Sequence, residues 1–269
     1  MPRFDITTIG EGQLRYCVPA GQRMERADRF DLYVSGTEAN VAGLLARLGW
    51  RSGFITSLPR NPLAQRIVNE YRLAGMDLAA LVWRDEGRVA TYYVEYAVPP
   101  RPIQVFFDRK GTCFSELTPD DIDWNYLLDT RLLHLSGLSV PLSPSVRAII
   151  SEAASRARAA GVPVSFDMNY RRRLWTPEAA AAAVLPIMRQ VDLLFCGRGD
   201  ARQLFGCDGS PEEIVGQLAA LTGAGHVVTS LSGEGLIGWD GQAFHRQPAR
   251  EVQIIDRIGA GDAMVAGVL

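Results

Sequence analysis

The sequence predicts an α/β protein built on a doubly wound, mostly parallel sheet flanked by helices, with a small β lid. From about residue 120 onward, short apolar runs alternate with longer amphipathic segments, the pattern of strand–helix–strand units. Residues 88–112 break that rhythm with two β-branched and aromatic runs. The chain has 269 residues, 47% of them hydrophobic, so we expect one domain spanning 1–269 with a large core.

The second half of the chain is expected to form the parallel sheet. Apolar runs predict four strands, at 131–135, 163–167, 191–195 and 226–230. Amphipathic patterns predict helices over 143–160 and 210–222, and an N-cap threonine before Pro177 marks the start of another. Ligands of doubly wound sheets bind at the carboxyl ends of the strands. Four residues fall at such ends: Asp167, Gly197, Ser230 and Asp262.

The first third of the chain is expected to form the lid. Residues 88–96 and 103–109 are β-branched and aromatic and flank a proline-rich turn, so a hairpin-like pair is expected. Residues 12–34 are expected to add another strand, which gives lid segments of about 12–34 and 88–112. Between the two lid segments, residues 41–48 predict a short helix.

Composition excludes several classes of function. The formal net charge of −2 gives no electrostatic footprint for nucleic acid or an anionic membrane. The most apolar stretch, 179–188, is too short to span a bilayer, and no secretory signal is visible, so we expect a cytoplasmic protein. The four cysteines form no C-x-x-C pair, which favours reduced thiols over zinc or disulfides. Lys110 is the only lysine, and no Walker-type phosphate loop exists.

The segment Gly259-Ala260-Gly261-Asp262 is the most informative motif. It follows a strand-like run at 251–255 and precedes an apolar stretch that can begin a helix at Ala263. Unpaired N–H groups at a helix start carry partial positive charge, and glycines let a phosphate approach them. An aspartate there can accept a hydroxyl proton while the N–H groups stabilise a transferring phosphoryl group. The same pattern also fits an aspartate that only caps the helix.

Together with this motif, the order of the segments resembles the PfkB/ribokinase family of carbohydrate kinases. The matching segments are Gly10-Glu11 after the first strand, Gly36 to Ala42 before a helix, the aromatic lid, Asp167 to Arg171, and Asp256 to Asp262. The segment Asp167 to Arg171 and the Trp175 that follows are similar to the 2-keto-3-deoxygluconate kinase branch. The resemblance covers nearly the whole chain and implies a ribokinase-like fold.

The resemblance implies an ATP-dependent kinase that phosphorylates the terminal hydroxyl of 2-keto-3-deoxygluconate, giving 2-keto-3-deoxy-6-phosphogluconate. It implies that Asp262 is the base and that the N–H groups of Gly259, Ala260 and Gly261 form the anion hole for the γ-phosphate. A guanidinium fork matches a carboxylate, so the acid group is expected to meet two arginines. The substrate-binding residues implied are Gly36, Asn40, Tyr92, Arg109, Asn169 and Arg171.

ATP and Mg²⁺ are the implied cofactors. The nucleotide is expected beside Asp200, Ser230, Ser232, Gly233 and Gly235. Mg²⁺ is expected to bind the ATP phosphates, with Asp200 reaching it through water and no direct protein ligand. Relative to the family pattern, 197–200 lacks an amide, 230–235 lacks its first glycine, and Phe107 replaces a tyrosine. Asp256-Arg257 stands where the family often has Asp-Thr, which leaves a monovalent cation site near this turn open.

Two further expectations concern assembly and length. Lid strands leave exposed edges, and a homodimer with lids pairing edge to edge is expected, consistent with the family. The sequence stops at Leu269, about two turns into the predicted helix, where the family usually continues for several elements. Whether this is a partial sequence or an incomplete nucleotide site stays open.

Three alternatives compete with the acid kinase. A kinase for a neutral sugar of the fructose or ribose type would not need Arg109 and Arg171. A catalytically weak, sugar-binding regulatory protein would fit the altered segments 197–200 and 230–235. A Rossmann oxidoreductase is disfavoured because no G-x-G-x-x-G follows the first strand.

Overall fold

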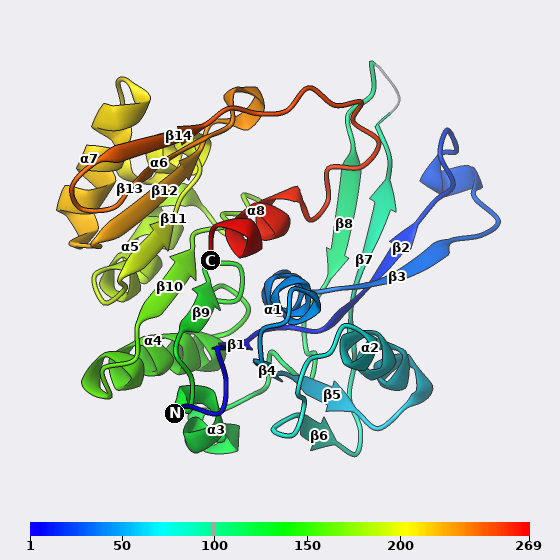
Figure 1. Ribbon diagram of the computed structural model, residues 1–269. Helices are drawn as coiled ribbons and strands as arrows, with labels where there is room; N and C mark the ends of the chain where they lie inside the picture. The colour runs from blue at the N-terminus through cyan, green and yellow to red at the C-terminus, as the bar shows by residue number, and fades with distance from the viewer. Residues whose placement is uncertain (98–99) are drawn as a thin grey trace.

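An eight-stranded sheet forms the centre of the protein. The structure is a computed structural model that describes residues 1–97 and 100–269. Strand order in the sheet is β14-β13-β12-β11-β10-β9-β1-β4 (Figure 1). The strands are β1 (Ile6–Ile9), β4 (Ser52–Ile55), β9 (Leu133–Ser136), β10 (Val164–Asp167), β11 (Leu193–Phe195), β12 (His226–Ser230), β13 (Leu236–Trp239) and β14 (Phe244–Gln247). In this sheet the neighbours β4, β1, β9, β10, β11 and β12 pair in parallel, and only β13 and β14 are antiparallel, which confirms the predicted fold class.

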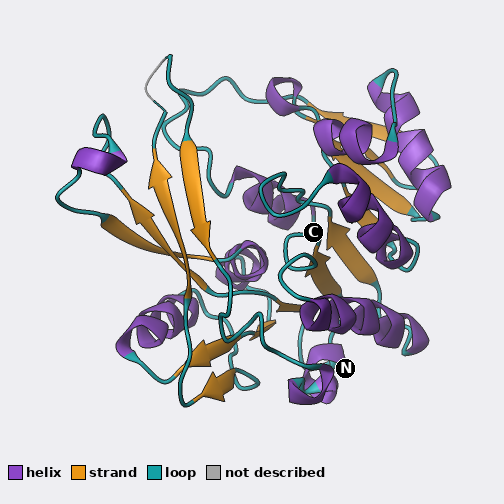
Figure 2. Cartoon of the chain, turned by 180° about the vertical axis from the view of Figure 1, so that it is seen from behind, coloured by secondary structure: helices purple, strands orange, loops and turns teal. Residues whose placement is uncertain are grey.

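Helices cover both faces of this sheet (Figures 1 and 2). On one face, α1 (Thr37–Arg47) packs against α8 (Ala260–Val268) over Ile6 and Phe195. The other face carries α3 (Trp124–Leu128), α4 (Pro144–Ala159), α5 (Pro177–Met188), α6 (Arg198–Phe205) and α7 (Pro211–Thr222). Because α1 and α8 lie side by side, their first turns meet at the carboxyl ends of the central strands.

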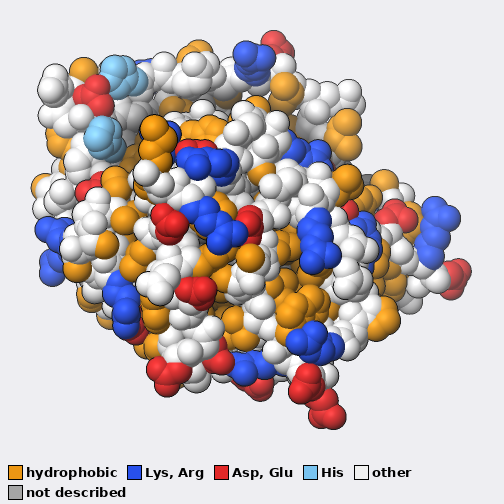
Figure 3. Space-filling view, turned by 60° about the horizontal axis from the view of Figure 1, so that its bottom comes forward, with side chains coloured by type: hydrophobic (Ala, Val, Ile, Leu, Met, Phe, Trp, Pro, Cys, Tyr) orange, Lys and Arg blue, Asp and Glu red, His pale blue; other side chains and the backbone are white. Residues whose placement is uncertain are grey.

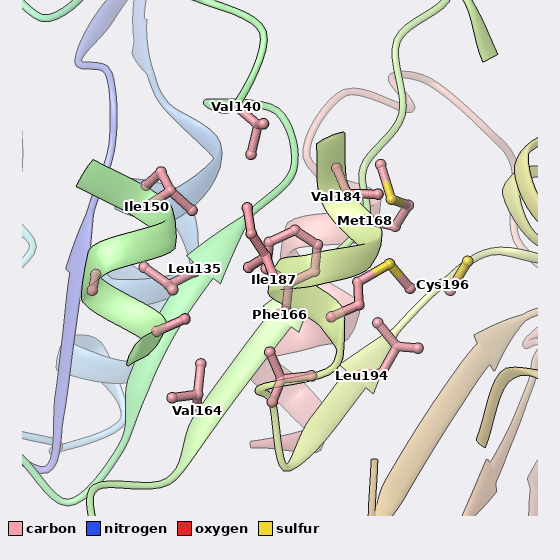
Figure 4. Packing of buried hydrophobic residues seen from close by; sticks show 14 of the residues in the cluster. Leu135, Val140, Ile150, Val164, Phe166, Met168, Val184, Ile187, Leu194 and Cys196 are labelled. Carbon is pink, nitrogen blue, oxygen red and sulfur yellow. The ribbon is translucent and has the colours of Figure 1, made fainter. Parts of the chain in front are cut away.

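The main core lies between the sheet and helices α4 to α7. Alternate residues of each strand point to one face, so Leu135 of β9, Phe166 of β10 and Leu194 of β11 all face this layer (Figure 4). Ile150 of α4 and Ile187 of α5 pack against them. Burying a side chain of this size stabilises the fold by roughly 1.5–3 kcal/mol, so the layer holds the strand ends rigidly in register.

A second, four-stranded sheet forms the lid, in the order β3-β2-β7-β8. Its strands are β2 (Gln13–Cys17), β3 (Asp31–Ser35), β7 (Ala90–Glu95) and β8 (Gln104–Asp108). Strand β2 pairs in parallel with β7, and the two outer pairs are antiparallel. Below the lid, α2 (Pro62–Leu73) lies beside the short parallel pair β5 (Ser57–Pro59) and β6 (Val82–Arg84). Three short 3-10 turns, Met24–Arg26, Pro119–Asp121 and Ser232–Glu234, complete the secondary structure described.

The segment that joins β14 to α8 corrects one prediction. Residues 251–255 were expected to form a strand, but the structure assigns them neither strand nor helix. The segment crosses from the main sheet toward the lid (Figure 1), and Val252, Ile254 and Ile255 are exposed. A strand forms only where another strand can accept its hydrogen bonds, and this connection pairs with none among the described residues.

Surface charge and helix length are two further features of the fold. On the face shown in Figure 3, basic and acidic side chains are interspersed rather than gathered by sign. Among the helices formed by residues 1–97 and 100–269, none is long and apolar enough to cross a membrane.

Candidate active site

A cavity of about 660 Å³ lies between the lid and the carboxyl ends of the central strands. Its floor comes from residues that follow β10, β11 and β12, one wall from β7 and β8 of the lid, and another from the start of α8. Ten of the residues predicted for the site line it: Asn40, Tyr92, Arg109, Asn169, Arg171, Asp200, Ser230, Gly259, Gly261 and Asp262. Segments far apart in sequence are therefore brought together as the strand–end rule predicts.

Five predicted residues lie outside the lining. Gly36 sits between two lining residues, and an added Cβ there would lie 2.7 Å from the Glu11 carbonyl oxygen. Ala260 is the first residue of α8. Ser232, Gly233 and Gly235 belong to the turn between β12 and β13, where a Cβ on Gly235 would lie 2.1 Å from the Gln247 carbonyl oxygen. Close backbone packing thus accounts for that glycine, and its nucleotide contact stays a prediction.

Asp262 lies in the first turn of α8. The helix begins earlier than predicted, at Ala260, with Gly259 as N-cap in a left-handed conformation that glycine adopts without strain. Asp262 is therefore not the capping residue. Asp262 is 7% exposed, and its carboxylate accepts hydrogen bonds from the Thr37 hydroxyl at 2.9 Å and the Asn40 amide at 2.6 Å. Burial raises the pKa of Asp262, and these two hydrogen bonds act against that rise.

The helix start supplies donors for an anion. Within residues 1–97 and 100–269, the N–H groups of Gly259 and Gly261 have no hydrogen-bond acceptor. The Ala260 N–H donates to the Arg257 carbonyl at 3.3 Å. Free N–H groups and the positive end of the helix dipole favour a phosphate here, beside the Asp262 carboxylate.

A hydrogen-bonded chain connects β10 with α8. The Asn169 amide donates to the Thr37 hydroxyl at 3.1 Å and to the Asp167 carboxylate at 3.2 Å. Because the Thr37 oxygen accepts from Asn169, its own proton points to Asp262. Asn169 has φ 41°, a left-handed conformation that asparagine tolerates better than most residues. Sequence reasoning missed Thr37, although it lies three residues before Asn40, on the same face of α1.

Acidic groups gather on the cavity floor. Burial, reinforced by the nearby Asp262 and Asp200 charges, raises the pKa of Asp167 to about 7. Burial also raises the pKa of Asp200, whose carboxylate accepts the Tyr170 N–H at 3.2 Å. The exposed guanidinium of Arg171 lowers the pKa of all three carboxyl groups and is the nearby positive charge that partly balances them.

The lid wall carries Tyr92 and Arg109. Tyr92 faces the cavity and exchanges a 2.9 Å hydrogen bond with Ser35, whereas Tyr93 stacks on Tyr16 with ring centroids 5.3 Å apart. The implied substrate-binding residue Tyr92 therefore faces the cavity, and the next residue, Tyr93, is not part of its lining. Arg109 is buried and paired with Glu11, which sequence reasoning recognised only as part of a motif.

The site combines a buried carboxylate, free N–H groups at a helix start and a cavity covered by a β lid. These features define a phosphotransferase that acts on small molecules. Comparison with known proteins makes this class specific: the family model of the pfkB family carbohydrate kinases matches residues 5–269, and the chain belongs to that family. The resemblance seen in the sequence is thereby confirmed.

Several proteins named for a specific kinase activity are similar to this chain. The 2-dehydro-3-deoxygalactonokinase of Haloferax volcanii is 31% identical over 265 residues, which are 98% of this chain and 83% of the relative. The 2-dehydro-3-deoxygluconokinase of Thermoproteus tenax is 29% identical over 272 residues, 99% and 78% of the two chains. The crystal structure of 2-dehydro-3-deoxygluconokinase from Thermotoga maritima has a TM-score of 0.91 at 30% identity, covering 98% of this chain and 84% of that one.

Proposed function

We propose that this carbohydrate kinase uses ATP to phosphorylate the terminal hydroxyl of 2-keto-3-deoxygluconate, also named 2-dehydro-3-deoxygluconate, giving 2-keto-3-deoxy-6-phosphogluconate. The observation that carries the proposal is the placement of Asp262 beside the free Gly259 and Gly261 amides, in one cavity with Arg109 and Arg171. A carboxylate base and an anion site serve phosphoryl transfer, and two arginines serve an acid substrate.

In the proposed reaction, the oxygen of the sugar hydroxyl attacks the γ-phosphorus of ATP while Asp262 takes the hydroxyl proton. The bond from that phosphorus to the β–γ bridging oxygen breaks, and ADP leaves. Gly259 and Gly261 amides stabilise the charge on the transferring group. Thr37 and Asn40 hold both carboxylate oxygens of Asp262 in place, so the base needs little reorientation.

ATP and Mg²⁺ are the proposed cofactors. Ser230 and Asp200 line the cavity beyond the helix start, where the nucleotide would lie. Mg²⁺ prefers carboxylate oxygens and its own waters, and Asp200 offers such an oxygen. When bound, the ion neutralises phosphate charge. A structure of an E. coli protein described as a putative ribokinase II, in complex with ATP and Mg²⁺, has a TM-score of 0.87 at 20% identity and supports the shared fold alone.

Before the anion-hole turn, Arg15 already neutralises the Asp256 carboxylate, since its Nη1 lies 3.3 Å from that group. We therefore expect turnover without an added monovalent cation, which comparison of sodium-, potassium- and Tris-buffered assays would test. Because the reaction consumes ATP, we place it in the cytoplasm.

The test is a coupled ADP-release assay with Mg·ATP and 2-keto-3-deoxygluconate, run beside fructose and ribose. Turnover of the acid alone supports the proposal, and turnover of neutral sugars alone replaces it with a neutral-sugar kinase. Binding of the acid without ADP release indicates a regulatory binding protein. The 4-epimer, 2-keto-3-deoxygalactonate, is a second candidate substrate because a relative with 31% identity is named for it, and it belongs in the same assay.

We also propose a homodimer formed through the lid. Leu32, Tyr16, Tyr93 and Phe106 are register neighbours across its four strands and form one apolar row. None of these four belongs to the cavity lining, and Phe106 is 46% exposed. Because this row lies on a face of the lid sheet, a second copy would bury it by face-to-face contact. Pairing of the lid edges alone would leave it exposed. Sedimentation should show a dimer that Phe106→Asp dissociates; a monomeric parent protein contradicts the proposal.

A further inference from the structure

Glu11 occupies an unusual position for an acid. It lies in the turn after β1 and is 1% exposed. A buried carboxylate is costly unless it is paired and hydrogen-bonded. Glu11 has such partners: its Oε2 accepts from Arg109 Nε at 2.5 Å and from Gln13 Nε2 at 3.3 Å, and its Oε1 accepts from the Thr112 hydroxyl at 2.6 Å. Two residues that follow β8 thus hold the carboxylate: Arg109 holds Oε2, and Thr112 holds Oε1.

Arg109 is left with unused donors by this arrangement. Its side chain is 4% exposed, and its Nε is occupied by Glu11. Its Nη1 is buried and has no hydrogen-bond partner among residues 1–97 and 100–269. Arg109 also lines the cavity. A guanidinium has five donors in a rigid fork, so with Nε fixed by Glu11, the buried Nη1 calls for an acceptor that residues 1–97 and 100–269 do not supply.

We propose that Glu11 is a positioning residue that fixes the Arg109 guanidinium for the carboxylate of the substrate and so selects acids over neutral sugars. The proposal rests on the function proposed above. Glu11 acts through Arg109 and does not touch the substrate. Thr112 supports it by holding the second carboxylate oxygen, which prevents the Glu11 side chain from turning away.

The ion pair with Glu11 keeps Arg109 from being an isolated buried charge when the site holds no substrate. An arginine fixed in advance also loses less side-chain freedom on binding than a mobile one. A neutral sugar gains little from this geometry because it presents no matching pair of acceptor oxygens.

The test compares KM and kcat for 2-keto-3-deoxygluconate and for 3-deoxyglucosone, in which an aldehyde replaces the carboxylate. Glu11→Gln keeps the shape and removes the charge. We expect it to raise KM for the acid by about ten- to hundredfold, with a much smaller effect on kcat and on the neutral analogue. Thr112→Val leaves both charges in place and should raise KM for the acid in the same direction, but less. Asp108→Asn is the matched control: this half-exposed acid precedes Arg109 in the sequence, pairs with Arg88, and should leave both substrates unaffected when changed.

A double variant shows whether Glu11 acts through Arg109. In an Arg109→Met background, Glu11→Gln should cause no further rise in KM for the acid. If Glu11→Gln and Thr112→Val fold and keep the parental KM values, the positioning role is overturned while the kinase function stands. An equal loss of kcat/KM on the acid and on 3-deoxyglucosone has the same consequence. If Glu11→Gln does not fold, Thr112→Val decides alone. Failure of the parental protein to phosphorylate any keto-deoxy acid removes the proposed function and this inference together.

Discussion

The carboxylate of Asp262 accepts a 2.6 Å hydrogen bond from the side-chain amide of Asn40, although 222 positions separate the two residues. The bond joins the first turns of α8 and α1, which pack side by side on the sheet (Figure 1). A second bond to the same carboxylate, from Thr37, comes from the same turn of α1. The proposed base is therefore oriented by a neighbouring helix rather than by its own.

Asp262→Asn should lower kcat by about 10²–10⁴-fold, because the amide keeps the shape of the carboxylate but cannot accept the hydroxyl proton. Binding of the sugar acid, measured by calorimetry, should change little. Asp85→Asn serves as control, since that side chain is 96% exposed and is not part of the cavity lining. Substantial turnover by the Asp262 variant would remove this residue from the role of base.

Thr37→Val should move the acid limb of the pH–rate profile to higher pH. The Thr37 hydroxyl donates to the ionised form of Asp262, which lowers the pKa of the carboxyl group, so its loss adds to the rise that burial already causes. At high pH, where the base is ionised in both proteins, kcat should converge. Ser35→Ala removes a hydroxyl that bonds Tyr92 instead, and its acid limb should stay in place. An unmoved limb in the Thr37 variant contradicts the assignment.

Local pattern was sufficient for the four parallel strands β9 to β12 and for the position of the Asp262 motif. Periodicity located strands such as 226–230 because each buries its own apolar side chains. The apolar run 251–255 had similar composition and failed as a strand, because pairing depends on a neighbour that local sequence does not contain. The helix start was predicted too late for a related reason. In the sequence, Ala260 and Gly261 look like turn residues, whereas in the structure the left-handed Gly259 is the N-cap and the helix begins at Ala260.

Long-range polar partnerships were beyond the sequence pattern. Glu11 and Arg109 are 98 positions apart, and neither position alone indicates a buried ion pair. The parallel pairing of β2 with β7 was equally hidden, since it joins residues near 13 to residues near 90. Arg109 was therefore predicted as a free carboxylate binder, whereas the structure shows it partly engaged.

Arg171→Gln should raise KM for 2-keto-3-deoxygluconate by about ten- to hundredfold, because a charge-assisted hydrogen bond to the acid group is lost. The acid limb of the pH profile of kcat should also move to higher pH, since Arg171 lowers the pKa of Asp262 and its removal raises that pKa. Steady-state kinetics on the acid and on 3-deoxyglucosone separate the two effects, because only the first depends on the substrate carboxylate. Arg147→Gln, an exposed change on α4, is the control. An equal loss of kcat/KM on both substrates would mean that Arg171 acts only through its charge on the site and does not bind the substrate carboxylate.

Glu38→Gln should stabilise the protein increasingly as the pH rises. Burial raises the pKa of Glu38 from 4.5 to about 7, and the Ser139 hydroxyl donates to it at 2.7 Å. Between these two pH values the unfolded chain has released the proton and the folded chain retains it, so the free energy of unfolding of the parent falls with rising pH. The neutral glutamine avoids this loss. The free energy of unfolding of Glu38→Gln relative to the parent should therefore increase by roughly 3 kcal/mol between pH 4 and pH 8, measured by urea unfolding. The exposed change Glu178→Gln should show no such trend, and a pH-independent difference for Glu38→Gln would mean that this carboxyl group does not titrate in that window.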